Sequence, residues 1–453
     1  MYTILGAGLS GLSIADHLLK QGIPFEIFES KSHGGGHIYS EVVDGFTWDE
    51  GPHVSFTQHQ YVKDYFAANC RQQYLEYLTN PTNYFKSSWI PHPTQSNMYA
   101  VAEPLRSECI ASAKMARAEY PADYLPANYQ EWIDYAFGKK FAEVFPAIYT
   151  KKYWTTEPAN LSTDWIGKRI YFPELSDMID SATAPLDKQT HYISKVRYPK
   201  NGGYYSYIKG VEKSIPVKYN KQLDFISFKN KQLFFSDGKQ AGYDKLISTL
   251  PLPQLVLHSD APENIKNSAS KLKCSQVLLI NVVVDHPPVI PNHWIYVYDE
   301  NFYSTRINFT DLLAPANGIV GKCGIQVEVY FSDYHPITES TNHIEQAVLK
   351  ELISMQLIKS AEFIESYHSK WINWANVIFD KERLKAQDEV FAWLEGMGMA
   401  REENDLEPMT VWEKKQPTIL GDIILAGRFA QWKYFWTDDC VMRAKFISEN
   451  LND

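Results

Sequence analysis

Residues 2–11 read YTILGAGLSG, and this stretch decides the fold. Its apolar first half is typical of a buried strand, and the glycine spacing GxGxxG follows directly. A helical pattern then runs to Gly22, after which the segment 25–30, FEIFES, predicts a second buried strand that closes on Glu29. The sequence therefore predicts a strand–helix–strand unit with parallel strands and a right-handed crossover. The glycines of the spacing are Gly6, Gly8 and Gly11.

The same unit carries the signature of a dinucleotide site. Glycines at a strand–helix turn let bare backbone and the helix N-terminus approach a pyrophosphate. Glu29 lies 18 residues beyond Gly11, where a carboxylate accepts hydrogen bonds from an adenosine ribose and disfavours a 2'-phosphate. The spacing alone is a weak signal, and a tight turn with a surface glutamate is the alternative interpretation. A second glycine cluster at 34–36 favours FAD over NAD, because it lets the chain pass beside a long extended cofactor.

The composition limits which ligands to expect. The chain has 453 residues, 45% of them hydrophobic and 22% charged, as in an ordinary globular protein. Its net charge of -10, without a long Lys/Arg run, argues against nucleic-acid binding, so a few placed arginines must hold any anionic ligand. Aromatic residues reach 14%, with 29 Tyr and 12 Trp, which suits a pocket for a ring-bearing ligand.

The cysteines and the N-terminus predict a reducing compartment. Five widely spaced cysteines without a CxxC pair argue against a disulfide framework and against a zinc site, so we predict no metal. The chain opens straight into a strand pattern, and no apolar stretch approaches the roughly 18 residues of a membrane span. We therefore expect a cytoplasmic protein without a membrane span.

Beyond residue 56 the chain alternates between helical and strand-like regions. We predict helices over 99–118, 127–145, 341–358 and 381–399, and mainly strands, including the hairpin LDFISFKNKQLFFSD, between 215 and 335. Residues 400–417 are expected to be a charged, exposed connection. The segment GDIILAGRF then predicts a last buried strand, followed by a helix that begins after Thr437 or Asp438.

The order of these features resembles the flavoprotein group that contains amine oxidases, protoporphyrinogen oxidases and UDP-galactopyranose mutases. The resemblance implies an α/β fold: a Rossmann-type FAD-binding domain with a mixed central sheet, a helical subdomain and an antiparallel-sheet substrate subdomain. The FAD-binding domain is expected to be discontinuous, over 1–95, 191–250 and 418–453. The helical subdomain is expected at 96–190 and the sheet subdomain, with its own helices, at 251–417. The implied cofactor-binding residues are Gly6, Gly8, Gly11, Glu29, Gly35, Gly36, Gly203, Arg428, Asp438 and Asp439.

Several short motifs are similar to those of the mutase branch. GPHVSF at 51–56 looks like an element whose histidine lies beside the redox-active nitrogen of the flavin, which assigns His53, although a lone histidine is often only a turn residue. YTKKYW at 149–154 resembles a motif whose tyrosine stacks on uracil and whose tryptophan lies in the substrate cleft, here Tyr149 and Trp154. Alone, such an aromatic pair more often packs helices together. HPTQSNM at 92–98 is similar to a substrate segment and assigns Gln95 and Asn97, but His92 and Thr94 depart from the usual aromatic residues.

Two further motifs assign a diphosphate clamp. WIGKRI at 165–170 and YSTRI at 303–307 resemble mutase elements whose arginines, here Arg169 and Arg306, grip the pyrophosphate of the nucleotide sugar. A guanidinium suits this task because it offers paired donors and keeps its charge. Two surface arginines are the alternative interpretation.

GRFAQWKY at 427–434 adds Arg428 beside the flavin and Tyr434 beside the substrate phosphates. Trp436 stands where bacterial members have an acid, and Asp438 where the eukaryotic type has an asparagine. Including Trp294, the implied substrate-binding residues are Gln95, Asn97, Tyr149, Trp154, Arg169, Trp294, Arg306, Tyr434 and Trp436.

The resemblance implies a redox-neutral enzyme of polysaccharide biosynthesis. In the mutases, reduced FAD acts as the nucleophile that interconverts the pyranose and furanose forms of a nucleoside-diphosphate hexose. The catalytic residues would be His53, Arg169 and Arg306, and an external reductant would serve the flavin. An oxidase or dehydrogenase of the amine oxidase or protoporphyrinogen oxidase type is the alternative, and a flavin-binding protein without catalysis is a third hypothesis. The sugar, the base and a homo-oligomeric state stay open.

Overall fold

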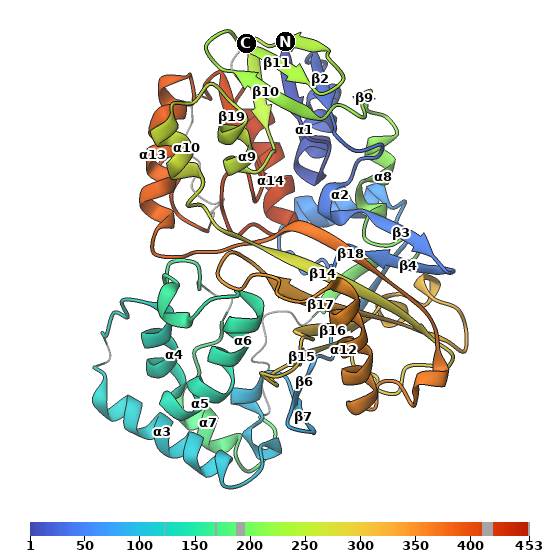
Figure 1. Cartoon of the computed structure of the whole chain (residues 1–453), viewed down its shortest axis with the longest axis vertical. Helices are drawn as coiled ribbons and strands as arrows, with labels where there is room; N and C mark the ends of the chain where they lie inside the picture. The colour runs from blue at the N-terminus through green and yellow to red at the C-terminus, as the bar shows by residue number, and fades with distance from the viewer. Residues whose placement is uncertain (122, 168–169, 187–194, 410–419, 452–453) are drawn as a thin grey trace.

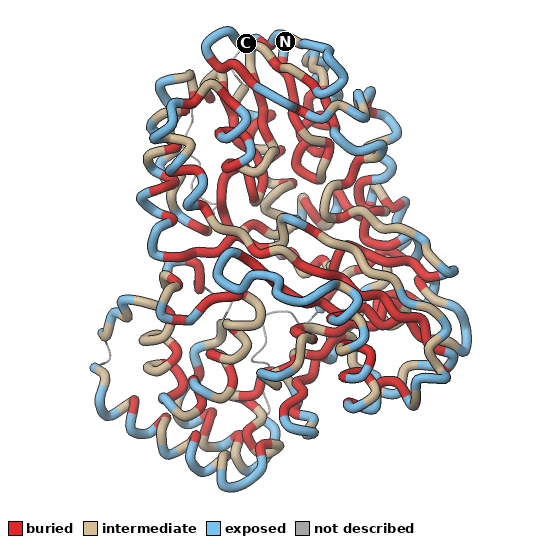
Figure 2. The backbone as a smooth tube through the Cα atoms, in the orientation of Figure 1, coloured by how far each residue is buried: buried red, intermediate tan, exposed pale blue. Residues whose placement is uncertain are grey.

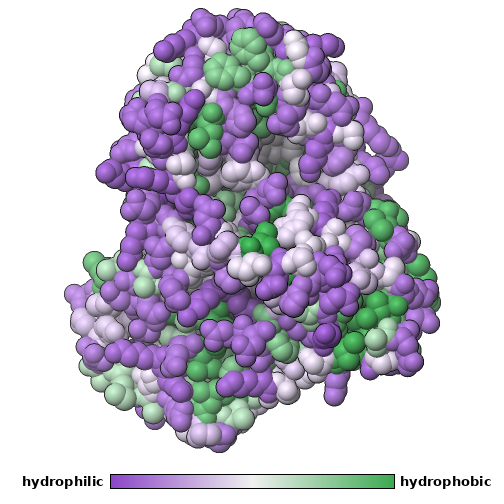
Figure 3. Space-filling model, viewed as in Figure 1, coloured by the Kyte–Doolittle hydropathy of each residue, from purple (hydrophilic) through white to green (hydrophobic). Residues whose placement is uncertain are grey.

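The computed structural model describes residues 1–121, 123–167, 170–186, 195–409 and 420–451. Figure 1 shows a sheet with its helices at the top, a long second sheet across the middle and right, and a group of helices at the lower left. Buried segments run along both sheets and through the helical group in Figure 2. Hydrophilic side chains cover most of the face in Figure 3, where hydrophobic ones form separate patches. No helix within the described ranges has both the length and the apolar character that a membrane crossing needs.

The first sheet has five strands, and each of its pairings is parallel. Across the sheet the strands are β19 (Ile423–Leu425), β13 (Lys245–Ser248), β1 (Tyr2–Leu5), β2 (Phe25–Phe28) and β9 (Val217–Lys218). Its core cluster includes residues of α1 (Leu9–Gln21), α2 (Gln60–Asn69), α8 (Ser206–Glu212) and α14 (Thr437–Glu449), and also Leu313. The predicted strand–helix–strand unit is therefore confirmed.

The second sheet has seven strands and is mixed. In order they are β18 (Ile364–Val377), β14 (Cys274–Val284), β17 (Cys323–Phe331), β16 (Arg306–Phe309), β15 (Trp294–Val297), β6 (Thr82–Phe85) and β7 (Ser88–Pro91). Only β15 and β6 pair in parallel. Helix α12 (Thr341–Ser354) buries Ile344, Val348 and Leu352 against the strands, and α11 (Thr310–Leu313) follows β16 directly.

Within the described residues, the helical group contains the long helix α3 (Leu105–Glu119) and four shorter ones, α4 (Tyr129–Phe137), α5 (Lys139–Val144), α6 (Pro146–Tyr153) and α7 (Leu175–Asp180). The predicted helix over 127–145 is divided at Gly138, where φ is +81° and an added Cβ would lie 2.5 Å from the backbone nitrogen of Ala113. The close approach of α3 therefore requires glycine at this position and ends α4.

Smaller elements connect these regions. The predicted hairpin is confirmed as β10 (Leu223–Ser227) and β11 (Gln232–Phe235), to which β12 (Gln240–Gly242) adds a third strand. Two further antiparallel pairs are β3 (Ser40–Val43) with β4 (Phe46–Asp49), and β5 (Tyr74–Leu78) with β8 (Lys195–Pro199). The remaining helices are α9 (Leu252–Leu257), α10 (Glu263–Ala269) and α13 (Arg383–Gly396).

The structure differs from the sequence predictions in three places. Strand β18 was not predicted, because it is half exposed and lacks a continuous apolar run. Residues 400–409 are not a freely exposed connection, since the carboxylate of Glu402 pairs with Arg443 and the backbone carbonyl of Asn404 accepts from Lys433. Strands β6 and β7 lie in the predicted FAD-binding segment 1–95 but extend the seven-stranded sheet, so this segment serves two sheets. The division into three domains stays a prediction.

Candidate cofactor and substrate site

The turn between β1 and α1 forms a bare backbone cradle. Helix α1 begins after Gly8, and no side chain caps its first turn. An added Cβ on Gly11 would lie 1.9 Å from the carbonyl oxygen of Gly6, and one on Gly36 would lie 2.9 Å from the Cα of Gly8. The backbone N–H of Gly35 donates to Ala7 O at 2.8 Å, which ties the second glycine cluster to the first. The helix N-terminus therefore presents free N–H groups beside two glycine segments, which fits a pyrophosphate.

Glu29 lies at the end of β2 with its carboxylate beside this cradle. One oxygen accepts from the backbone N–H of Ala7 at 2.7 Å, and the other accepts from Ser30 Oγ at 3.1 Å and from the backbone N–H of Lys31 at 2.9 Å. A carboxylate offers about four acceptor positions, so three bonds leave one for a ribose hydroxyl. Both the cradle and this carboxylate fit the dinucleotide that the sequence predicts.

His53 lies in the loop after β4, next to a buried polar network. Its Nδ1 is 2.9 Å from the carbonyl oxygen of Gly51, and its ring packs against Tyr204 with 5.4 Å between centroids. Burial lowers the pKa of His53 to about 4, and the positive charges of His37, Arg306 and Arg428 act in the same direction. The imidazole is therefore neutral at pH 7. Because a carbonyl can only accept, Nδ1 carries the proton and Nε2 is left as an acceptor.

Asp49, at the end of β4, accepts three hydrogen bonds through its carboxylate. The donors are the hydroxyls of Ser40 and Tyr198, at 2.5 and 2.7 Å, and the backbone N–H of Tyr204, at 3.0 Å. Burial raises the pKa of Asp49 to about 6 despite these bonds. Gly203 lies against the same group, where an added Cβ would be 2.6 Å from Asp49 Oδ1. The network joins the His53 loop to the turn that contains Gly203.

Arg306 begins β16 and faces Glu328 on β17, directly across the strand pair. Its Nε lies 2.5 Å from Glu328 Oε2 and its Nη2 lies 2.7 Å from Glu328 Oε1. Burial would lower the pKa of Arg306, but the carboxylate of Glu328 outweighs it and the pKa lies well above the ordinary value. The arginine predicted to bind a diphosphate is thus already in a bidentate ion pair.

A wall of aromatic rings extends from α6 to the loop before α14. Tyr149 packs against Tyr153, with 5.7 Å between centroids, and Trp154 packs against Tyr434 at 5.5 Å. The Arg428 guanidinium lies over the Tyr434 ring, 5.3 Å from its centroid. Burial raises the pKa of Tyr149 and of Tyr153, and each residue keeps part of its surface accessible. Three predicted residues, Tyr149, Trp154 and Tyr434, therefore belong to one wall.

Arg428 is placed between this wall and the N-terminus of α14. Its Nε donates to the carbonyl oxygen of Phe435 at 2.8 Å, and among the described residues neither Nη atom has a hydrogen-bond acceptor. Asp439 accepts from the backbone N–H of Trp436 at 2.8 Å and so caps α14. Asp438 is half-buried in the same first turn.

The structure also places the other predicted substrate residues that it describes. Asn97 Nδ2 donates to Pro93 O at 2.9 Å. The backbone carbonyl oxygen of Gln95 accepts from Ser181 Oγ at 3.3 Å. Trp294 is buried on β15, with 4% of its surface exposed, and Trp436 packs edge-on against Phe56. Arg169 lies outside the described residues.

Sequence reasoning missed several residues of the site: Glu328, Tyr153, Tyr296, Tyr298 and Tyr330. Tyr296 and Tyr298 pack against Tyr149 at 5.5 and 5.6 Å, and Tyr330 packs against Tyr153 at 4.9 Å. The signals were a charged residue within the apolar run 323–331 and tyrosines at every second position of a strand.

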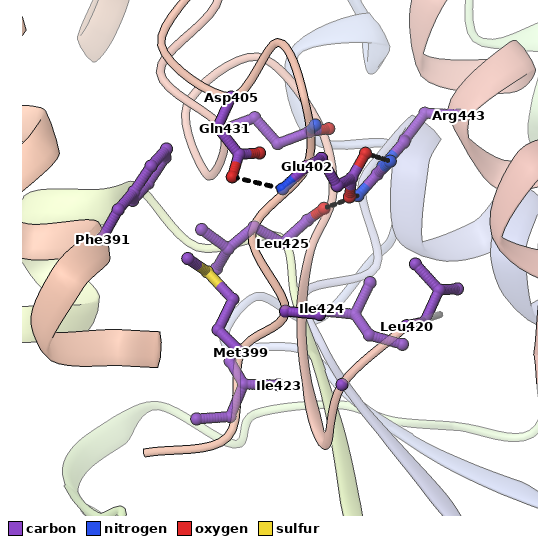
Figure 4. A pocket seen from close by; sticks show the side chains of 12 residues that line it. Phe391, Met399, Glu402, Asp405, Leu420, Ile423, Ile424, Leu425, Gln431 and Arg443 are labelled. Carbon is purple, nitrogen blue, oxygen red and sulfur yellow. Dashed lines mark hydrogen bonds and ion pairs between the residues drawn. The ribbon is translucent and has the colours of Figure 1, made fainter. Parts of the chain in front are cut away.

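A cavity outside this site contains none of the predicted residues. In Figure 4, Glu402 and Arg443 pair across it at 2.6 and 2.8 Å, and the backbone N–H of Glu402 donates to Asp405 at 2.7 Å. The carboxylate of Glu402 is therefore paired, whereas Nε of Arg443 is buried without a hydrogen-bond partner among the described residues. The lining residues are Phe391, Met399, Ala400, Glu402, Asp405, Leu420, Gly421, Ile423, Ile424, Leu425, Gln431 and Arg443.

No group of three or more His, Cys, Asp or Glu side chains in the described ranges is arranged to hold a metal ion. All five cysteines are free thiols.

Comparison with known proteins agrees with this architecture. Residues 4–68 match the family model of an NAD(P)-binding Rossmann-like domain. The whole structure superposes on a crystal structure of reduced UDP-galactopyranose mutase with a TM-score of 0.88 and 22% sequence identity, over 99% of this chain and 93% of that one. The chain has the fold of UDP-galactopyranose mutase. The predicted fold class and the resemblance to this enzyme are confirmed at the level of the fold.

The mutase fold is shared with proteins of other activities. A fatty acid isomerase from P. acnes that produces CLA superposes with a TM-score of 0.62 and 13% identity, over 100% of this chain and 98% of that one. A variant of putrescine oxidase superposes with a TM-score of 0.60 and 14% sequence identity, over 99% of this chain and 98% of that one.

Curated relatives match only a short stretch. The zeta-carotene-forming phytoene desaturase of Myxococcus xanthus is 35% identical over 82 residues, which are 18% of this chain and 16% of that enzyme. The 4,4'-diapophytoene desaturase of Staphylococcus aureus strain Newman is 37% identical over 75 residues, 17% of this chain and 14% of that enzyme.

Proposed function

We propose that the chain is an FAD-dependent enzyme that interconverts the pyranose and furanose forms of a nucleoside-diphosphate hexose without net redox change. One observation supports the proposal most strongly: Arg306 interacts electrostatically with both Tyr149 and the neutral His53, and Arg428, which also acts on His53, follows Gly427, whose added Cβ would lie 2.6 Å from Ser10 Oγ in the first turn of α1. The similarity in fold to reduced UDP-galactopyranose mutase supports it.

The cradle and Glu29 would hold the adenosine diphosphate part of FAD, with Arg428 and the first turn of α14 nearer the flavin. Bound flavin, when reduced, supplies a nucleophilic nitrogen toward an anomeric carbon. The task of His53 is to stay uncharged and to present Nε2 as an acceptor, because its Nδ1 proton is held by Gly51 O. The cluster of positive charges around it opposes protonation of the ring.

The substrate would lie along the tyrosine wall. A rigid phenol ring such as Tyr149 binds a pyrimidine by stacking, which adds affinity without a charge. Arg306, and with it Arg169, would hold the diphosphate close to the anomeric carbon and stabilise the charge that develops as the bond to it breaks. A leaving group kept in place in this way can rejoin the anomeric carbon, so the bond that breaks is re-formed and the product is an isomer of the substrate at the same oxidation level.

A net oxidoreductase is the second candidate. The short match to two desaturases and the shared fold of a putrescine oxidase favour it, as does the neutralisation of Arg306 by Glu328. Such an enzyme would bind an apolar or amine substrate along the same aromatic wall and would have no use for a diphosphate.

Ligand binding separates the two candidates. The purified flavin-loaded protein is titrated with UDP by calorimetry, in parallel with Arg306→Ala and Arg306→Lys. The proposal expects UDP to bind, Ala to weaken binding strongly with the flavin spectrum intact, and Lys to restore part of it. If UDP does not bind to protein with a normal flavin spectrum, the mutase proposal is wrong.

A further inference from the structure

The ion pair between Arg306 and Glu328 is built into the sheet. The two residues are direct partners in the antiparallel register of β16 and β17, so their side chains leave the same face at neighbouring positions. The exposed fractions of the two side chains are 22% and 3%. A pair that is fixed by backbone register and whose carboxylate is buried is not a chance surface contact.

Glu328 also touches the loop that carries His53. An added Cβ on Gly51 would lie 3.0 Å from Glu328 Oε1, so the carboxylate is wedged between Arg306 and that loop. The backbone carbonyl of Glu328 accepts from the N–H of Thr305 at 2.9 Å, which fixes the approach to β16. The carboxylate therefore cannot move far without disturbing both sides of the site.

The pairing changes what Arg306 can offer a ligand. A guanidinium has five N–H donors, and Glu328 takes one from Nε and one from Nη2. Among the described residues no acceptor lies within hydrogen-bond distance of Nη1, so this edge is still available. The net charge of the pair is zero, however, and an incoming diphosphate meets the negative charge of Glu328 together with the positive charge of Arg306.

We propose that Glu328 sets the affinity of this site for a nucleoside diphosphate, by holding Arg306 in place while competing with the diphosphate for its charge. The inference rests on the proposed function and deepens it, since it names Glu328 as a positioning residue of the same site. An enzyme that must release a nucleotide sugar after each turnover gains from a clamp that is attenuated in this way.

The test is a UDP titration of flavin-loaded, full-length protein carrying Glu328→Gln. The variant keeps the shape of the side chain and removes the competing charge, so we expect Kd for UDP to fall by about tenfold or more, with a steeper dependence on salt. A merely structural role predicts the opposite, because losing a buried partner weakens a site. In the Arg306→Ala background Glu328 has no guanidinium to compete for, so the two substitutions should not be additive in their effects on Kd for UDP.

The chain offers a matched control in Glu402. It also forms a bidentate pair with a buried arginine, Arg443, although through Nη1 and Nη2, and this pair lies outside the site, so Glu402→Gln removes a paired carboxylate there and should leave Kd for UDP unchanged. If Glu328→Gln fails to fold, Glu328→Asp keeps the charge but withdraws the carboxylate, and a smaller decrease in Kd is expected.

Three results would overturn the inference. In the first, UDP binds the unaltered protein but binds Glu328→Gln no more tightly, although the flavin spectrum of the variant is normal. This result contradicts the role of Glu328 and leaves the proposed function standing. An equal tightening in Glu402→Gln contradicts it as well. Absence of UDP binding in the unaltered protein and all variants contradicts both proposals together.

Discussion

Replacing Gly36 with alanine should displace the flavin by spoiling the cradle. Gly36 has φ +58°, and its added Cβ would lie 2.9 Å from the Cα of Gly8, a backbone atom that cannot turn aside. A left-handed backbone costs a residue with a Cβ about 1–2 kcal/mol, and overpacking costs about 1–3 kcal/mol more. We therefore expect Gly36→Ala to lower the free energy of unfolding by about 2–5 kcal/mol.

Gly238 supplies the matched control. Its φ is +79°, and nothing lies within 4 Å of its added Cβ, so Gly238→Ala isolates the cost of the left-handed backbone, about 1–2 kcal/mol. Urea denaturation followed by tryptophan fluorescence gives the free energy of unfolding of each variant. The visible absorbance of the flavin in the purified protein gives the amount of flavin that stays bound. Gly36→Ala should lose flavin and Gly238→Ala should keep it. Equal free energies and equal flavin contents in the two variants would refute the proposed contact between the glycine segments.

Three further perturbations test the site. Because burial raises the pKa of Asp49 from 3.8 to about 6, the folded state holds this proton more tightly, and stability should fall by about 3 kcal/mol as pH rises from about 4 to 6. Asp49→Asn should remove that component in denaturation measured across this range, and an unchanged pH profile would contradict it. The pKa of His53 is lowered from 6.5 to about 4, so its contribution to stability is lost as pH falls through this window, and NMR of the His53 ring should show a midpoint near 4 rather than above 6. Tyr149→Ala should raise Kd for UDP by roughly tenfold or more, and Tyr149→Phe should leave it close to the original, since stacking needs the ring and not the hydroxyl. Equal losses in the two variants would show that the hydroxyl matters instead.

The dinucleotide-binding half of the fold follows closely from the sequence because its signals are local. The run at 2–5, the glycine spacing and the terminator Gly22 all act within one strand–helix turn, and the structure places β1 and α1 at the expected residues. Strand β18 escaped prediction because its side chains are only half-buried, so its order comes from pairing with β14 and not from its own hydrophobic pattern.

The site is less predictable, because it is assembled across distant segments. Tyr149, Arg306 and Arg428 could be assigned from motifs, but the partner of Arg306 depends on the register between β16 and β17. No local pattern specifies that register, and Glu328 therefore stayed hidden within an apolar run. Asn97 was assigned from a motif alone, and the local contact that its side chain makes, a hydrogen bond donated to Pro93 O, could not be read from that motif.

The most direct test of the central claim is turnover by the reduced protein. Flavin-loaded protein is reduced with dithionite and incubated without oxygen with the pyranose and furanose forms of UDP-hexoses, and the products are separated by chromatography and examined by NMR. We expect conversion by the reduced protein with no net consumption of reductant, and none by the oxidised protein. Turnover only by the oxidised protein, with release of peroxide, would contradict that claim.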